Sequence, residues 1–220
     1  MRIKIDINMK VGRVVKYFIL SDIVLLTGWG LVEPVFAIFV IEKIPGASVI
    51  TVGISAAIYW IIKSTLQLPI ANYLDRTDGE KDDFYALITG LFIASISATL
   101  FVVVREIWQL YLVQAVHAVG FALYFSSWAA IFSRHLDKDR ISFDWALNST
   151  TVGIAAGISG LIGGIVAGGI GFTPLFVFCG ILSAVAAMIL LLVPDLVLPR
   201  SQSSVVVPPV IKEKPPSKIG

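Results

Sequence analysis

Charged side chains are scarce in this sequence. Only 15% of the 220 residues are Asp, Glu, Lys or Arg, whereas 57% are hydrophobic. Because soluble domains carry about 25% charged residues, this scarcity excludes an ordinary soluble domain and indicates a protein that crosses a membrane several times. Cysteine is almost absent too. Cys179 stands alone, which excludes an internal disulfide framework and favours a packing role within its apolar run.

The sequence also lacks the residue clusters that carry catalysis. Both histidines, His117 and His135, are isolated from nucleophiles and from metal-ligating residues, and there is no phosphate-binding loop. We therefore expect a protein that is not an enzyme and that binds neither a metal ion nor a cofactor.

Long apolar runs are abundant, by contrast. About 20 apolar residues are needed for a helix to cross roughly 30 Å of hydrocarbon, and runs of this length exclude barrel strands. We predict an all-α polytopic membrane protein with a basic N-terminus (1–16) and a Pro-rich flexible tail (195–220). The first run lacks a small-residue cleavage site, so we interpret it as a retained helix and not a signal peptide. The six predicted transmembrane helices are 17–41, 48–74, 84–104, 108–132, 145–170 and 172–194.

The distribution of Lys and Arg predicts the orientation of these helices. Fourteen of the seventeen basic residues lie in the termini or in the segments 75–83 and 133–144, which would all face the same side. The remaining loops hold only Lys43 and Arg105. Since basic loops tend to stay in the cytoplasm, we expect both termini to be cytoplasmic in a plasma or inner membrane.

Four ionisable residues are predicted to lie within the membrane: Asp22 and Glu33 on the first helix, Lys63 on the second and His117 on the fourth. Each costs about 2.5–3.5 kcal/mol at the bilayer centre on insertion scales, so each is a candidate for function. Lys63 could pair with Glu33, line a polar cavity with Glu33 and His117, or extend toward the membrane surface. His117 could transfer protons or act as a neutral hydrogen-bonding residue.

Polar and aromatic residues accompany these four on shared helical faces. Trp60, Lys63 and Gln67 follow spacings of three and four, and Gln114 and His117 are three apart. Side chains of these types line solute pathways, so we predict a cavity for a small-molecule solute. Its candidate residues are Glu33, Trp60, Lys63, Gln67, Gln114, His117, Tyr124 and Trp128.

The fifth predicted helix carries glycines in pairs four residues apart. Small residues at this spacing let helix backbones approach closely. We expect them to pack helices within the subunit or, alternatively, to form a sliding or dimer interface. They are Gly153, Gly157, Gly160, Gly164 and Gly168.

The turn after the second predicted helix is strongly polar, because residues 75–83 hold seven of the chain's 32 charged side chains. Ala71, Asp75, Arg76 and Gly79 occur there in order. This pattern resembles the signature that the major facilitator superfamily carries between its second and third helices, with the glycine one place later here. The first helix is similar to the family's pattern as well, in Asp22, Gly28, Gly30, Pro34 and Val35.

The resemblance implies that residues 17–194 form one six-helix half of the family's fold. In the family, the Asp and Arg of this turn form a cytoplasmic latch that opens and closes one side of the transporter. Asp75 and Arg76 would take those roles beside Gly79, with Arg134 or Arg140 as partners. A solvated turn without a gating role is the alternative.

Two family patterns are incomplete in this chain. Gln114 stands where proton antiporters often carry an arginine, and Ser159 stands where the drug-antiporter pattern has part of a Gly-Pro pair. A solute carrier or uniporter therefore fits at least as well as a drug–proton antiporter.

Family transporters have two halves with the binding site between them. We expect this chain to be a half-size transporter that pairs as a parallel C2 dimer, or with a different half-size partner, to move a solute by alternating access. The alternative is a non-transporting membrane interaction or sensor protein that keeps the half-fold. In either case we expect contact with the lipid bilayer and none with nucleic acid.

Overall fold

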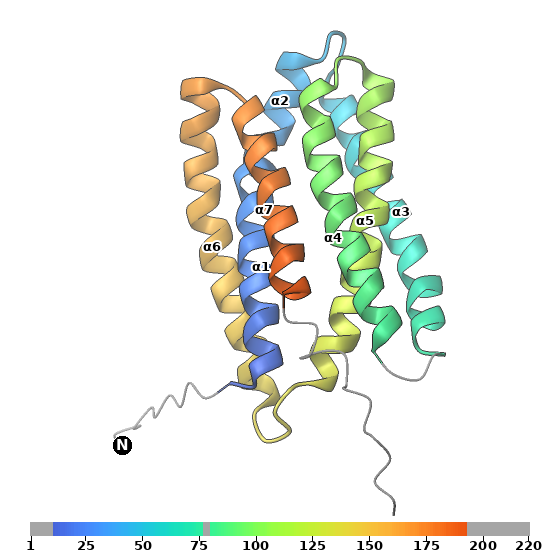
Figure 1. Ribbon diagram of the computed structural model, residues 1–220. Coiled ribbons are helices and arrows are strands. Elements are labelled where there is room, and N and C mark those ends of the chain that lie inside the picture. Colours follow the sequence, from blue (N-terminus) through green and yellow to red (C-terminus); the bar gives the residue numbers. More distant parts are fainter. Residues whose placement is uncertain (1–10, 77–79, 193–220) are drawn as a thin grey trace, which may run out of the picture.

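The computed structural model describes residues 11–76 and 80–192, and within these ranges all regular secondary structure is helical (Figure 1). Six segments are long and apolar enough to cross a membrane, because α1 to α2 form one broken span. The predicted all-α polytopic fold is thereby confirmed. The predicted tail, 195–220, lies outside the described residues. The elements are α1 (Arg13–Val32), η1 (Glu33–Val35), α2 (Phe36–Lys43), α3 (Val49–Leu74), α4 (Lys81–Leu100), η2 (Phe101–Val103), α5 (Ile107–Arg134), α6 (Ile141–Ile170) and α7 (Thr173–Leu191).

The first span is broken where proline enters it. Pro34 has no N–H to donate, so the helix tightens into the 3₁₀ turn η1 at Glu33–Val35 before it resumes as α2. Glu33, the first residue of this turn, lines the pocket described below.

A glycine ends one helix, and side-chain caps begin two others. Gly171 follows α6 with φ of 90°, a backbone conformation that only glycine adopts at low cost. Ser48 and Thr51 form a reciprocal capping box at the start of α3, and Glu106 and Gln109 form another at the start of α5. These residues mark where α3 and α5 begin and where α6 ends.

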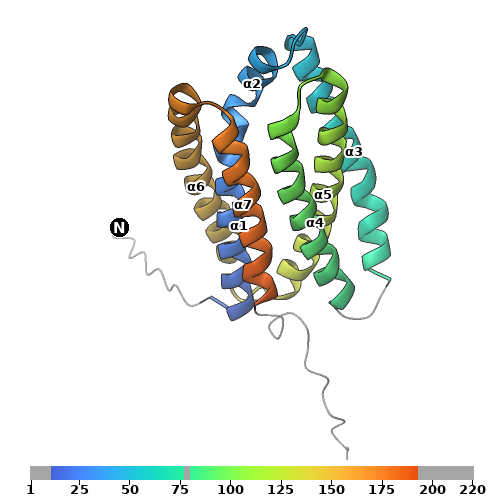
Figure 2. The same ribbon diagram turned by 45° about the horizontal axis from the view of Figure 1, so that its top comes forward.

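The six spans form a bundle with two exposed edges. α1 packs against α6 and α7, α4 packs against α5 and α7, and α3 packs mainly against α5. Figures 1 and 2 both show α6 at one edge and α3 at the other. Consequently these two helices are the least buried of the six spans, and each presents a long apolar face to its surroundings.

Glycine permits the closest helix contacts. A Cβ added at Gly90 on α4 would lie 2.6 Å from the Tyr124 backbone nitrogen, so α4 and α5 can approach this closely only without a side chain there. Similarly, a Cβ at Gly163 on α6 would lie 2.0 Å from the Leu31 carbonyl oxygen on α1. These contacts fix α5 and α6 against the rest of the bundle.

The glycines singled out on α6 are placed differently from Gly163. Gly160 approaches Pro34 and Gly30, and a Cβ there would lie 3.3 Å from the Pro34 side chain. The other four have no described residue within 4 Å of such a Cβ and point away from the bundle. They are Gly153, Gly157, Gly164 and Gly168.

Candidate functional site

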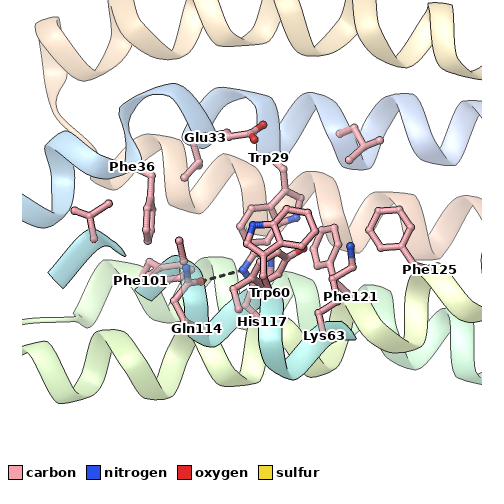
Figure 3. A pocket seen from close by; sticks show the side chains of 15 residues that line it. Trp29, Glu33, Phe36, Trp60, Lys63, Phe101, Gln114, His117, Phe121 and Phe125 are labelled. Atoms are coloured by element: carbon pink, nitrogen blue, oxygen red, sulfur yellow. Dashed lines mark hydrogen bonds between the residues drawn. The ribbon is translucent and has the colours of Figure 1, made fainter. Parts of the chain in front are cut away.

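A pocket of about 320 Å³ lies between α1, α3 and α5, in the range typical of small-molecule sites (Figure 3). Its walls are mainly aromatic, and its few polar groups are Lys63, Glu33, Gln114 and His117, with the hydroxyl of Tyr59. Trp60, on its rim, is 58% exposed, so the pocket opens to the surface of the bundle. The pocket can therefore admit a small molecule from the side that α3 borders.

His117 is part of an aromatic stack in this pocket. Its ring is parallel to Trp29, with centroids 3.9 Å apart, and stacks on Tyr59 at 4.6 Å. Nδ1 lies 3.1 Å from the Gln114 amide oxygen, which accepts its hydrogen. Within the part of the chain that the structure describes, Nε2 is buried and has no hydrogen-bond partner. The ring thus joins α1, α3 and α5, and one of its nitrogens is enclosed without a partner.

Lys63 is the cation of the pocket, and it is 93% buried, with 7% of its surface exposed. Its Nζ lies 3.9 Å from the centroid of Phe125 and 4.7 Å from that of Trp60. Aromatic faces attract an ammonium, but they do not neutralise it. Among residues 11–76 and 80–192, Lys63 has neither a hydrogen bond nor an ion pair, including with Glu33.

Glu33 lines the same pocket from η1, but its side chain is exposed. Figure 3 shows its carboxylate pointing away from the group formed by Lys63, Trp60 and His117. Of the three alternatives weighed for Lys63, the geometry favours lining of a cavity over pairing with Glu33.

Three of the eight candidate cavity residues lie outside this pocket. Tyr124 and Trp128 belong to the buried core next to α1, and Tyr124 donates a hydrogen bond to Asp22. The Gln67 carbonyl accepts a hydrogen bond from Ser126 at 3.3 Å, which joins α3 to α5. The five that line the pocket are Glu33, Trp60, Lys63, Gln114 and His117.

Sequence reasoning missed several aromatic wall residues, although helical spacing indicates them. Phe121 and Phe125 follow His117 at intervals of four on α5, and Tyr59 precedes Lys63 by four on α3. Trp29 precedes Glu33 by four on α1. Searching one or two helical turns on either side of each polar candidate would have identified them.

A second polar cluster lies at the end of the bundle where α4 begins and α5 ends. Arg134 donates a hydrogen bond to Asp83, whose side chain is fully buried, and lies 3.8 Å from Glu80. His135 Nδ1 lies 3.6 Å from the same Glu80 oxygen. Burial raises the pKa of Glu80 above its ordinary value, although the nearby charges of His135 and Arg134 oppose this rise.

The remaining residues of the expected latch lie around this cluster. The Asp75 N–H donates to the Ala71 carbonyl at 2.9 Å where α3 ends, and Arg76 follows as an exposed side chain. The Arg140 guanidinium lies 4.1 Å from the ring centroid of Phe143. Gly79 lies outside the described residues. Of the two expected latch partners, Arg134 lies at the start of α4, through its contacts with Asp83 and Glu80.

Comparison with known families defines the class of protein. The family model for the Major Facilitator Superfamily matches residues 18–217, most of the chain. The chain belongs to this superfamily, whose members are transporters rather than enzymes, and its six helices fit one half of the family's fold. No curated protein matches the chain closely enough to count as a relative.

Proposed function

We propose that this chain is a half-size transporter that moves a small solute across a cell membrane by alternating access. The observation that supports this most strongly is the pocket between α1, α3 and α5. It combines an opening to the surface with a buried cation, Lys63, that has no counter-charge among the described residues. A charge kept at membrane depth without a structural partner is typical of a solute pathway.

A second six-helix half would complete the pocket, and we propose that it is a second copy of this chain. Trp60 and Glu33 expose polar or amphipathic surface at the pocket's rim, which a partner would shield from lipid. The open space beside Gly153 and Gly157 on α6 would let a partner helix approach closely. Two copies with cytoplasmic termini insert in the same orientation, so a parallel C2 pair is geometrically simple. A different half-size chain would meet the same requirement.

The latch proposal concerns the other polar cluster. Asp75 and Arg76 lie where α3 ends, and Arg134 joins the start of α4 through Asp83. We propose that Asp75 and Arg76 contact the partner half when the cytoplasmic side closes, while Arg134 and Arg140 hold the neighbouring helix ends. Asp75→Asn should then slow transport without unfolding the protein. A loss of expression and thermal stability would instead indicate a purely structural turn.

Flux and oligomeric state test the proposal together. The purified full chain in liposomes should take up at least one of a set of labelled anionic, cationic and neutral small solutes. Lys63→Gln should lower that uptake by about tenfold or more, as expected when a charge-assisted contact is lost. Lys43→Gln is a matched control because Lys43 lies outside the pocket, beside Phe172.

Two results would contradict the proposal. A strict monomer in lipid nanodiscs would exclude the self-paired transporter. Absence of flux for every solute, with a protein that is folded and dimeric, would favour the alternative of a membrane interaction or sensor protein.

A further inference from the structure

We infer that the pocket binds an organic anion with a flat, apolar body, whose negative group contacts Lys63. This inference rests on the proposed function, because it assigns a solute class to the same pocket. It goes further in specifying the charge and the shape of what binds.

The charge follows from the surroundings of Lys63. Lys63 is a buried residue, and an ammonium at membrane depth is costly without an anion; the part of the chain that the structure describes supplies none to it. Its Nζ lies over the rings of Phe125, Trp60 and Tyr59, whose centroids are 3.9, 4.7 and 5.8 Å away. These rings hold the ammonium in position inside the pocket. The missing counter-charge is therefore the group that a solute would supply.

The position of Glu33 favours an anion over a zwitterion. Both charges line the pocket, but they form no ion pair, and the Glu33 carboxylate points away from Lys63 (Figure 3). The two charges of an amino acid are adjacent, so they would need Glu33 and Lys63 to converge on one point. A carboxylate or phosphate group alone needs only Lys63.

The shape follows from the walls. Trp29, Tyr59 and Phe121 pack around His117 and, with Phe125, line the pocket. Such walls bind flat apolar molecules by offset stacking and edge contacts. A cavity of about 150 Å³ holds benzene, so a pocket of about 320 Å³ has room for one or two fused rings and a charged group.

The nitrogens of His117 are held within the protein. His117 Nε2 is buried without a partner, while its Nδ1 is held by Gln114. Because Nε2 has almost no accessible surface, a solute would reach it only if the stacked rings of Trp29 and Tyr59 shifted. The polar groups are few, and each occupies a fixed position, as in sites where polar groups set the orientation of an apolar ligand.

Binding of three probes of equal size tests the inference. The full chain in lipid nanodiscs is titrated with 2-naphthoate, 2-naphthylmethylamine and 2-naphthylmethanol by calorimetry, with empty nanodiscs subtracted to remove partition into lipid. Saturable binding is expected for 2-naphthoate and weaker binding for the other two. Lys63→Gln should weaken naphthoate binding by about tenfold or more, Lys63→Arg should retain most of it, and Lys43→Gln should leave it unchanged.

Several results would overturn the inference. These are equal or tighter binding of the amine or the alcohol, naphthoate binding that does not depend on Lys63, or no saturable naphthoate binding at all. Tighter binding of 2-naphthylalanine than of 2-naphthoate would favour a zwitterion. Unchanged melting temperature and monodispersity of Lys63→Gln show that a loss of binding is not a loss of folding.

The outcome is separable from that of the transport proposal. Naphthoate binding without any flux would keep the solute class and contradict transport. Flux of a cationic or neutral solute, with no naphthoate binding, would keep transport and contradict the solute class.

Discussion

The pocket and the Arg134 cluster each contain a buried or partly buried cation, but they balance its charge in different ways. Arg134 contacts two carboxylates of its own chain, Asp83 and Glu80. Within the described ranges, Lys63 lies over three aromatic rings and forms no ion pair. A cation that the chain neutralises itself stabilises the fold, whereas a cation left without a counter-charge is available to a ligand. Substitution of Arg134 should therefore lower mainly the stability of the fold, whereas substitution of Lys63 should lower mainly solute binding.

The largest expected effect is on stability at Arg134. Arg134→Met leaves the fully buried Asp83 carboxylate without its cation. Breaking a buried pair costs about 3–5 kcal/mol. The Arg134 side chain is 37% exposed, so solvent screening lowers our expectation to about 2 kcal/mol. Thermal unfolding in detergent measures the loss, and Arg105→Met, in an exposed loop, is the control. Equal melting temperatures for the two variants would show that the cluster is not structural.

Lys63→Met should have the contrasting outcome. The variant loses cation–π contacts worth about 0.5–2 kcal/mol but also removes a desolvated charge, so the net change in stability should stay within about 1 kcal/mol. Uptake and naphthoate binding should nevertheless be lost. The same unfolding assay, run beside Arg134→Met, makes the comparison direct. A destabilisation as large as that of Arg134→Met would mean that Lys63 is a structural residue.

The sequence predicted the helices better than it predicted their faces. Long apolar runs indicate spans because the bilayer core has a fixed thickness. On α5, however, apolar residues occur on all sides, so the sequence alone does not distinguish the pocket face from the core face. Tyr124 follows His117 by seven residues, so helical periodicity puts both on the same side of α5, about 10 Å apart along its axis. Only the structure shows that His117 lines the pocket, whereas Tyr124 donates a hydrogen bond to Asp22 in the core.

The polar turn also shows a limit of prediction from the sequence. Its acidic residues are conspicuous in the sequence, but loop residues carry no periodicity that pairs them across space. The contact between Asp83 and Arg134 joins residues 51 positions apart and depends on how α4 and α5 cross. Pairing of Lys63 with Glu33 was a reasonable alternative by depth, yet the break at Pro34 turns Glu33 to a different side.

The smallest expected effect is a pH dependence at Glu80. Burial raises its pKa in the folded protein above the value in the unfolded chain. An acid with a raised folded pKa contributes stability that is fully present below its unfolded pKa and is lost as the pH rises through the folded pKa. The contribution of Glu80 should therefore fall as the pH is raised from about 4.5 toward neutrality. Glu80→Gln should remove this part of the pH dependence, by less than about 1 kcal/mol because the group is partly solvated.

The measurement is the difference in melting temperature between pH 5 and pH 7 for the two proteins, with Glu42→Gln as an exposed control. A larger acid stabilisation in Glu80→Gln than in the unchanged protein would contradict the assignment. It would mean that His135 and Arg134 lower the pKa of Glu80 more than burial raises it. The charges of the Arg134 cluster would then be balanced more completely than the comparison with Lys63 requires.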